Sequence, residues 1–216
     1  MDRQGAVTVR PVGDHALLLE VDSGPQVAAL YARLLAERAR GGLGEVAEIV
    51  PAACTVLLDG LPRPAELAGR LGGWRVAGDA PPEGPLIEIP TVYDGADLAT
   101  VAAHWGVTPA EAVALHSGFE YRVAFCGFSP GFGYLTGLPA HRAVPRRATP
   151  RAAVPPGAVA VAGEYTGVYP RSSPGGWQLL GRTDLVLWDA DRQPPALLTP
   201  GVRVRFVPVP APAAAR

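Results

Sequence analysis

Residues Tyr121–Leu135 read YRVAFCGFSPGFGYL. The run Tyr121–Cys126 is β-like in composition and ends at a glycine, which predicts a short strand. Similar short runs follow it, separated by glycine and proline: Ala158–Ala162, Gly176–Leu180, Asp184–Trp188 and Val202–Val207. Many short strands with such punctuation are typical of a closed barrel or a sandwich, and prolines between them mark loops at its rim.

The residues before Leu86 have a different organisation. Val7–Arg10 and His15–Val21 predict a β-hairpin, and Pro25–Arg40 repeats apolar residues at helical spacing. The remaining predicted elements of this part are the strands Glu45–Val50 and Thr55–Leu58 and the short helix Pro64–Leu71. Together they predict a small open α/β sandwich without a polar constellation of its own.

Glycine, proline and acidic residues cluster between Gly78 and Pro85, as is typical of a linker. We therefore predict a small α/β N-terminal domain over residues 1–78 and a mainly β C-terminal domain over residues 79–216. The second domain begins with a predicted strand at Leu86–Pro90 and two short helices, Asp97–Trp105 and Thr108–His116. The second helix carries a complete capping box, with Thr108 as N-cap and Glu111 three residues later.

The composition excludes several classes of chemistry. With 48% hydrophobic and 18% charged residues, the chain is expected to fold around a core. It has no lysine, which excludes a Schiff base, a lysine general base and a phosphate-binding P-loop. Cys54 and Cys126 belong to no metal-binding pattern, so we expect ordinary thiols and no metal site. Neither a signal sequence nor a membrane span is evident, and we expect a cytoplasmic protein.

The arginines are unevenly distributed. Residues 1–120 contain 8 arginines and 16 acidic residues, whereas residues 121–182 contain 7 arginines and the single acid Glu164. Such an excess of positive charge predicts an anion site or an acidic partner surface. The arginines alternate with rigid Pro-Gly turns, which favours a preformed pocket over a flexible arm for nucleic acid. We therefore expect no nucleic-acid partner.

Four stretches of this basic region combine glycine, aromatic residues and arginine: Gly127–Leu135, Pro145–Arg151, Gly163–Pro170 and Ser173–Thr183. Three of them are loops by composition. Glycine permits close backbone approach, aromatic rings exclude water and arginine binds anions, a combination that indicates a site for a small acid. Taken singly, each stretch is also compatible with an ordinary turn of a β-barrel.

Three strings within these stretches, taken in order, resemble one family. They are Pro-Gly-Phe-x-Tyr-Leu at Pro130–Leu135, Pro-Arg-Arg-Ala-Thr-Pro-Arg at Pro145–Arg151, and Ser-Pro-Gly-Gly-Trp-Gln-Leu-x-Gly-Arg-Thr at Ser173–Thr183. The family contains KipI and PxpB and is also called allophanate hydrolase subunit 1, or the C and D subdomains of a biotin-dependent carboxyltransferase. The resemblance runs from about Ile89 to Val207 and implies a cyclophilin-like β-barrel. The chain departs from the family pattern at Gly133, usually proline, and at Tyr165, usually glutamine.

The resemblance implies a function that depends on partners. Within the family, PxpB acts in an ATP-dependent 5-oxoprolinase that converts 5-oxo-L-proline to L-glutamate. The implied partners are a PxpC-like subunit (allophanate hydrolase subunit 2) and a PxpA-like subunit (LamB/YcsF). We expect this chain to be inactive alone, to contribute to substrate phosphorylation and to share ATP with a partner, with Mg²⁺ as a further candidate cofactor. Two alternatives stay open: a KipI-like inhibitor of a sensor histidine kinase, and a component of a biotin-dependent carboxyltransferase or urea amidolyase system.

The predicted site residues follow from this chemistry. Arg146 and Arg182 are candidates for stabilising charge on a transferred phosphoryl group. His116 is a candidate proton relay, although a histidine at a helix end can also simply stabilise the helix dipole. Gln178 is a candidate for orienting the substrate, although its neighbours could equally satisfy its amide. The predicted substrate contacts are Phe128, Pro130, Gly131, Phe132, Tyr134, Arg147, Arg151, Thr166, Tyr169 and Gln178.

Overall fold

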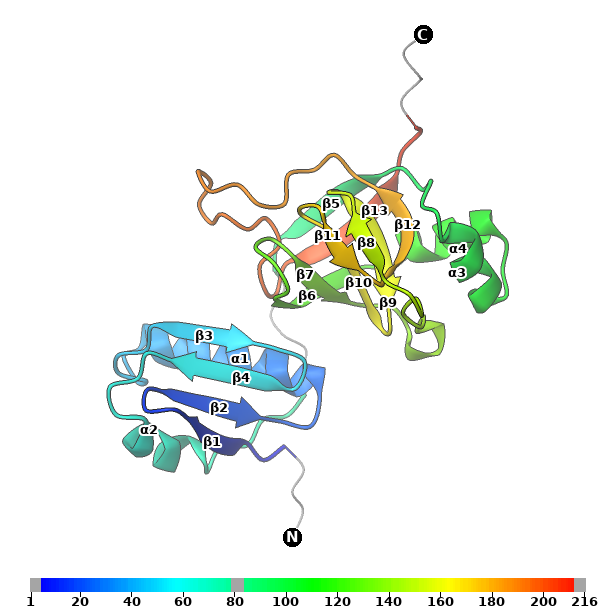
Figure 1. Ribbon diagram of the computed structural model, residues 1–216. Helices are drawn as coiled ribbons and strands as arrows, with labels where there is room; N and C mark the ends of the chain where they lie inside the picture. The colour runs from blue at the N-terminus through cyan, green and yellow to red at the C-terminus, as the bar shows by residue number, and fades with distance from the viewer. Residues whose placement is uncertain (1–4, 79–83, 212–216) are drawn as a thin grey trace. The chain divides into compact units, whose positions relative to one another are not determined.

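The computed structural model describes residues 5–78 and 84–211 (Figure 1). The chain forms two compact units, Met1–Glu83 and Gly84–Arg216. Each unit has its own hydrophobic core. The predicted linker includes residues 79–83, which lie outside the described residues, so the predicted boundary at residue 78 stays a prediction.

The N-terminal unit is an antiparallel sheet with two helices. Its elements are β1 (Thr8–Val12), β2 (Ala16–Glu20), α1 (Gly24–Ala39), β3 (Glu48–Pro51), β4 (Thr55–Asp59) and α2 (Pro64–Leu71). The strand order is β1-β2-β4-β3. Leu17 and Leu19 of β2 and Val56 and Leu58 of β4 are buried because alternate strand residues point to the same face. α1 packs on β3 and β4, and α2 packs on β1 and β2, as the predicted α/β arrangement requires.

The C-terminal unit is mainly β. Its strands are β5 (Leu86–Thr91), β6 (Tyr121–Cys126), β7 (Gly133–Thr136), β8 (Arg151–Val154), β9 (Ala158–Ala162), β10 (Tyr165–Val168), β11 (Ser173–Gly175), β12 (Gln178–Arg182) and β13 (Arg203–Pro208). Its helices are α3 (Leu98–Trp105), α4 (Pro109–Gly118) and the 3₁₀ turn η1 (Ala140–Arg142). Seven strands form one sheet in the order β12-β9-β10-β7-β6-β13-β5, and β8 pairs with β11.

The segment after β5 closes this sheet into a nearly complete barrel. Val92 and Arg182 exchange two backbone hydrogen bonds of 2.9 Å, and the Asp97 amide donates to the Leu179 carbonyl at 3.0 Å. These bonds join the two edge strands, β5 and β12. Of the two predicted architectures, a barrel or a sandwich, the structure is therefore the barrel. Gly181 lies at the joint, where a Cβ atom would overlap the Val92 carbonyl oxygen. The glycine of the Gly-Arg-Thr string is therefore required for closure.

The helical predictions were accurate, whereas one predicted strand is wrong and several strands were not predicted. The capping box of α4 forms, with Glu111 accepting from the Thr108 amide at 2.8 Å. The predicted strand Asp184–Trp188 is wrong: it belongs to a long connection in which Trp188 makes one isolated bridge to Ala196. The glycine-rich stretches interpreted as loops contain β7, β10 and β11. Among the described residues, no helix is both long and apolar enough to cross a membrane.

Candidate functional site

The barrel carries a pocket of about 450 Å³. This volume lies within the range of roughly 300–1,000 Å³ that is typical of small-molecule sites. Strands β7, β9 and β10 and the segment after η1 converge on it. Its lining residues are Tyr134, Ala143, Val144, Pro145, Arg146, Ala162, Gly163, Tyr165 and Trp177.

Aromatic rings form one wall of the pocket. The Tyr134 ring centroid lies 5.7 Å from those of both Tyr165 and Trp177. Behind this wall Phe132 packs edge to face at 5.0 Å from Tyr134 and 5.4 Å from Trp177. Phe125 stacks on Tyr134 at 4.4 Å. Rings that pack on one another in this way have few alternative positions, so the wall is rigid and preformed.

Arg146 supplies a positive charge to the pocket. Its side chain is exposed and makes no hydrogen bond or ion pair with any other residue that the structure describes. Arg146 lines the pocket together with Tyr134 and Trp177. Burial raises the pKa of the Tyr169 hydroxyl, and a backbone hydrogen bond with Trp177 and the Arg146 charge oppose that rise. A guanidinium in this situation is available for bidentate binding of a carboxylate or phosphoryl group.

The backbone on both sides of Arg146 is held in place. The Pro145 carbonyl accepts a hydrogen bond of 3.2 Å from Gln178 Nε2. The Arg147 amide donates to the Gly176 carbonyl at 2.8 Å. Arg146 is therefore presented by a fixed segment, and its backbone needs little reorganisation to bind an anion.

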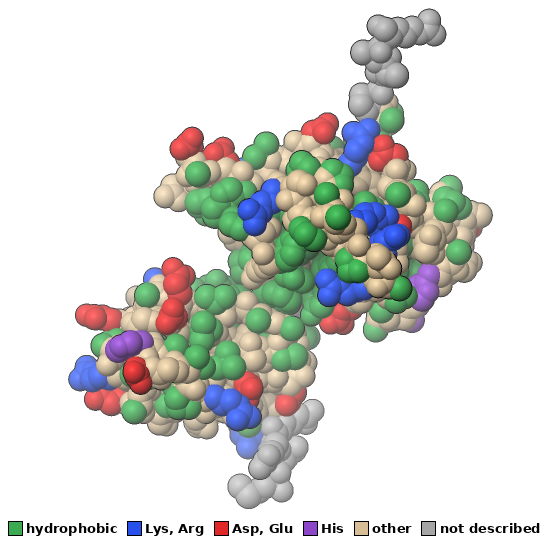
Figure 2. All heavy atoms as spheres, in the orientation of Figure 1, with side chains coloured by type: hydrophobic (Ala, Val, Ile, Leu, Met, Phe, Trp, Pro, Cys, Tyr) green, Lys and Arg blue, Asp and Glu red, His purple; other side chains and the backbone are tan. Residues whose placement is uncertain are grey.

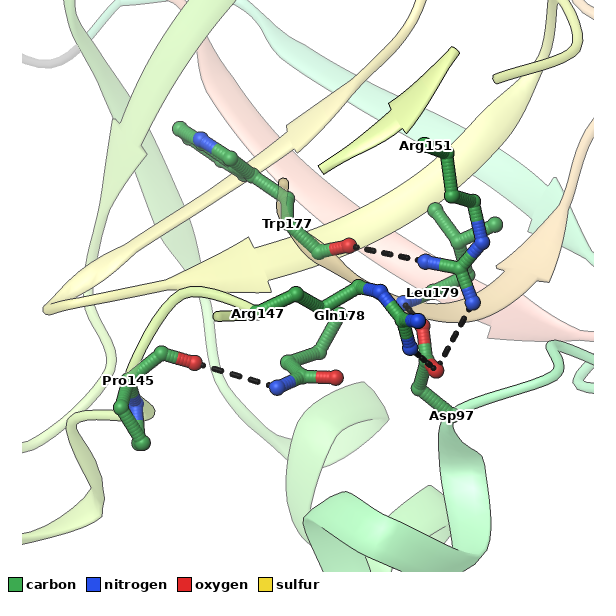
Figure 3. A network of polar contacts seen from close by, with 7 residues as sticks. All are labelled: Asp97, Pro145, Arg147, Arg151, Trp177, Gln178 and Leu179. Atoms are coloured by element: carbon green, nitrogen blue, oxygen red, sulfur yellow. Dashed lines mark hydrogen bonds and ion pairs between the residues drawn. The ribbon is translucent and has the colours of Figure 1, made fainter. Parts of the chain in front are cut away.

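A buried carboxylate anchors the same segment (Figure 3). Asp97 Oδ1 accepts hydrogen bonds of 2.8 Å from both Arg147 and Arg151, and its Oδ2 accepts one of 2.7 Å from the Leu179 amide. The Asp97 side chain is almost fully buried. Burial alone would raise its pKa, but these hydrogen bonds and the two arginine charges outweigh burial and hold the pKa below its usual value.

This network changes the interpretation of the basic region. Arg147 and Arg151 were predicted to bind substrate, but Figure 3 shows both guanidinium groups pointing at Asp97. Asp97 thus compensates part of the positive charge of residues 121–182. It lies more than fifty residues before Arg151 in the sequence. The arginines connect the segment that carries Arg146 to the segment that closes the barrel.

Two polar atoms beside the network have no partner among the described residues. Gln178 Oε1 and Arg147 Nε are both buried without a hydrogen bond. Buried polar groups are nearly always hydrogen-bonded. Both atoms are buried, and neither Gln178 nor Arg147 is among the residues that line the pocket.

His116 lies in the barrel core and not at the pocket. Its side chain is 0% exposed, with Nδ1 2.8 Å from the Tyr93 hydroxyl and Nε2 2.9 Å from the Thr166 hydroxyl. Thr166 donates its own proton to the Ala160 carbonyl, so Nε2 must carry the imidazole proton and Nδ1 must accept from Tyr93. Burial lowers the pKa of His116 to about 3. These contacts give His116 and Thr166 a structural position, away from any substrate at the pocket.

Arg182 is also separated from the pocket. It pairs with Asp94 at 3.0 Å, with both side chains more than 40% exposed. Along β9, Arg182 lies opposite Ala158, whereas the pocket is at Ala162, the other end of the strand. Four residues of strand span about 13 Å. Arg146 and Arg182 therefore do not form one anion site.

The remaining predicted residues divide into two groups. Tyr134 lines the pocket, and Phe132 and Tyr169 pack on each other behind it at 5.5 Å. Phe128 and Pro130 are exposed, and Gly131 is buried in the same loop. The structure thus gathers Tyr134 and Arg146 at one pocket and places the Phe128–Gly131 loop outside the pocket lining. The chemical roles of these residues stay predictions.

Three residues of the site were missed from the sequence. Tyr165 and Trp177 line the pocket and belong to the quoted stretches, but Thr166 and Gln178 were chosen beside them. Adjacent strand residues point to opposite faces, and the composition of a short strand does not show which face is inside. Asp97 was missed because nothing local distinguishes a buried carboxylate from a surface one.

Comparison with known proteins agrees with this architecture. The family described as carboxyltransferase domain, subdomain C and D, matches residues 7–198. The chain belongs to this carboxyltransferase family. Within it, a 5-oxoprolinase subunit of Escherichia coli O157:H7 is 45% identical to this chain over 207 residues, which are 91% of this chain and 94% of the relative. The kinship indicated by the three strings is thereby confirmed.

Solved structures share the fold of this carboxyltransferase family member. TTHA0988 is 36% identical with a TM-score of 0.75, and the match covers 94% of this chain but 41% of that longer one. The urea amidolyase of Kluyveromyces lactis has a TM-score of 0.71 at 18% identity, and the match covers 97% of this chain and 15% of that one. The second likeness shows a shared fold alone.

Proposed function

We propose that this chain is the PxpB-type component of an ATP-dependent 5-oxoprolinase, which converts 5-oxo-L-proline to L-glutamate with partner subunits. The observation that carries the proposal is a preformed aromatic pocket with one unpaired arginine, in a chain 45% identical to a protein named as a 5-oxoprolinase subunit. The substrate is a small flat ring with a carboxylate. Aromatic walls suit the ring, and Arg146 suits the carboxylate.

The pocket residues can supply part of what ATP-dependent opening of the lactam requires. In this proposal the amide oxygen of the lactam takes the terminal phosphoryl group of ATP, and ADP leaves. Water then adds to the ring carbon and the carbon–nitrogen bond breaks, with the nitrogen leaving as the protonated amine, which gives an acyl phosphate. A second water hydrolyses the acyl phosphate to the glutamate carboxylate and phosphate. Negative charge develops on the phosphoryl oxygens during transfer. Arg146 would hold the substrate carboxylate or that charge, and Tyr134 and Trp177 would exclude water.

ATP would be shared with a partner. The chain has no lysine for a P-loop. Within residues 5–78 and 84–211, no three His, Cys, Asp or Glu side chains gather into a group that could hold a metal ion. We therefore assign most nucleotide contacts and any Mg²⁺ ligands to PxpC-like and PxpA-like subunits in the cytoplasm. We also propose that the barrel has the cyclophilin-like fold.

Reconstitution tests this function directly. The purified chain is assayed for ATP-dependent release of glutamate from 5-oxo-L-proline, with and without the two partner subunits. We expect turnover only in the assembled system. Arg146→Lys keeps the charge but loses the bidentate geometry, so turnover should fall by about tenfold to a hundredfold, the equivalent of one charged hydrogen bond. Arg171→Lys is the matched control, because Arg171 is also exposed and lies outside the pocket lining.

Four outcomes would contradict the proposal. Turnover by the chain alone would remove the need for partners. Equal turnover rates for the Arg146 and Arg171 variants would show that Arg146 does not bind the substrate or the phosphoryl group. An assembled complex that is inert toward 5-oxo-L-proline but transfers carboxyl groups from carboxybiotin, or a chain that inhibits a sensor histidine kinase, would favour one of the alternatives.

A further inference from the structure

A hydrophobic surface lies on the barrel outside the residues that line the pocket. It consists of Phe128, Val186 and Trp188, which are 57%, 60% and 43% exposed. Clustered exposure of large apolar side chains is uncommon on a protein that works alone and usually marks an interaction site. We call these three residues the apolar surface.

The two segments that carry the apolar surface approach each other closely at Gly131. Gly131 lies in the loop after Phe128 and has φ +83°, and a Cβ atom on it would lie 2.8 Å from Trp188 Cβ. Only glycine allows the two segments to approach so closely. The surface is therefore built from two segments that are far apart in the sequence and lie side by side at Gly131 and Trp188.

Both segments are held rigidly. Phe128 has φ +65°, and the Ser129 amide donates to the Gly127 carbonyl at 2.7 Å, which forms a strained γ-turn with Phe128 at its centre. In the other segment, Arg192 donates to the carbonyls of Val186, Leu187 and Pro195 at 3.2, 3.1 and 2.8 Å. A rigid surface loses little entropy when it binds.

Burial explains why two apolar residues face outward. Leu187 is 2% exposed and belongs to the barrel core. Anchoring this central residue directs Val186 and Trp188 away from the core. Their exposure is therefore built into the packing of the segment, and the hydrophobic effect alone would favour covering them.

Acidic residues flank Val186 and Trp188 along the chain. Asp184, Asp189 and Asp191 are exposed and make no ion pair with other described residues. Figure 2 shows acidic side chains on the outer part of this connection, next to hydrophobic ones. An apolar centre with an acidic rim is complementary to a hydrophobic recess bordered by arginine or lysine.

We propose that the apolar surface binds the PxpC-like partner subunit, in a hydrophobic recess of that subunit that is bordered by arginine or lysine. The identity of the partner rests on the proposed function. In TTHA0988 the matching fold is 41% of the chain and is covalently joined to further polypeptide. Where this fold and its neighbour are separate subunits, they have to bind through a surface, and tryptophan, the type of Trp188, is among the residues most enriched at the centre of such interfaces.

Binding measurements with full-length subunits test the proposal. Affinity for the purified PxpC-like subunit is measured by calorimetry for wild type, Val186→Asp, Trp188→Ser and Val50→Asp. Val50 is the matched control, because it is 42% exposed and lies on the sheet of the N-terminal unit. We expect the first two variants to weaken binding at least about tenfold, with an unchanged thermal midpoint. Asp184→Asn with Asp191→Asn should slow association at low salt.

The outcomes separate this surface from the proposed function. Strong binding by wild type and weak binding by the two surface variants support the surface even if the complex does not hydrolyse 5-oxo-L-proline. Affinities within twofold of wild type, an equal loss in Val50→Asp, or absence of wild-type binding would overturn it. Loss of self-association in place of partner binding would also overturn it, because a second copy would then be the occupant.

Discussion

The buried histidine makes barrel stability depend on pH in a predictable direction. His116 has a pKa of about 3 in the folded chain because of burial, compared with 6.5 for an ordinary histidine. Between these values the unfolded chain binds one more proton than the folded chain. The free energy of unfolding therefore decreases as pH falls from 6.5 toward 3, and the full contribution is present only above 6.5.

The magnitude follows from the shift. Each pH unit in this window costs about 1.4 kcal/mol, so acidification from pH 7 to pH 5 should remove about 2 kcal/mol. Most carboxylates remain ionised above pH 5 and contribute little to this change. The thermal midpoint of the barrel unit should fall by roughly 5–10 °C.

A non-titrating variant checks the cause. In His116→Gln the amide oxygen can accept from Tyr93 and the amide nitrogen can donate to Thr166, which preserves the hydrogen-bonded chain. Urea unfolding at pH 7 and pH 5 should show a much smaller pH effect in this variant than in wild type. His104→Gln, at an exposed histidine, should behave as wild type. If His116→Gln keeps the full pH effect, or wild type shows none, the neutral buried histidine is refuted.

Three further predictions follow from the same structure. Asp97→Asn should lower the free energy of unfolding by about 2–3 kcal/mol, measured in urea, because two arginines lose a charged acceptor; a change below about 0.5 kcal/mol, the size of an ordinary surface substitution, would contradict the network. Arg182→Lys should leave both the assembly and the turnover of the complex unchanged, since its ion pair with Asp94 is exposed; a large loss of turnover would return Arg182 to the site. Limited proteolysis should cut first within residues 77–86, where the linker is predicted. A first cut within residues 121–182 would contradict that linker.

Much of the fold was readable from local sequence. The helix at Pro109–Gly118 was predicted from Thr108 and Glu111, because a capping box acts within one helical turn. The hairpin and helices of the N-terminal unit follow from the spacing of apolar residues. The family followed from three strings of residues in a fixed order. All of these signals lie within short windows of the chain.

The site depended on tertiary structure. Asp97 meets Arg147 and Arg151 only because the segment after β5 pairs with β12 and closes the barrel. That closure neutralises two of the predicted substrate-binding arginines, whereas Arg146 has no ion-pair partner among the described residues. It also separates Arg182 from Arg146, although both lie in one basic stretch of sequence. Local sequence determined the helices and part of the strands. The pairing of distant strands determined which charges meet a partner, because electrostatic contacts act over a few ångströms in space regardless of separation along the chain.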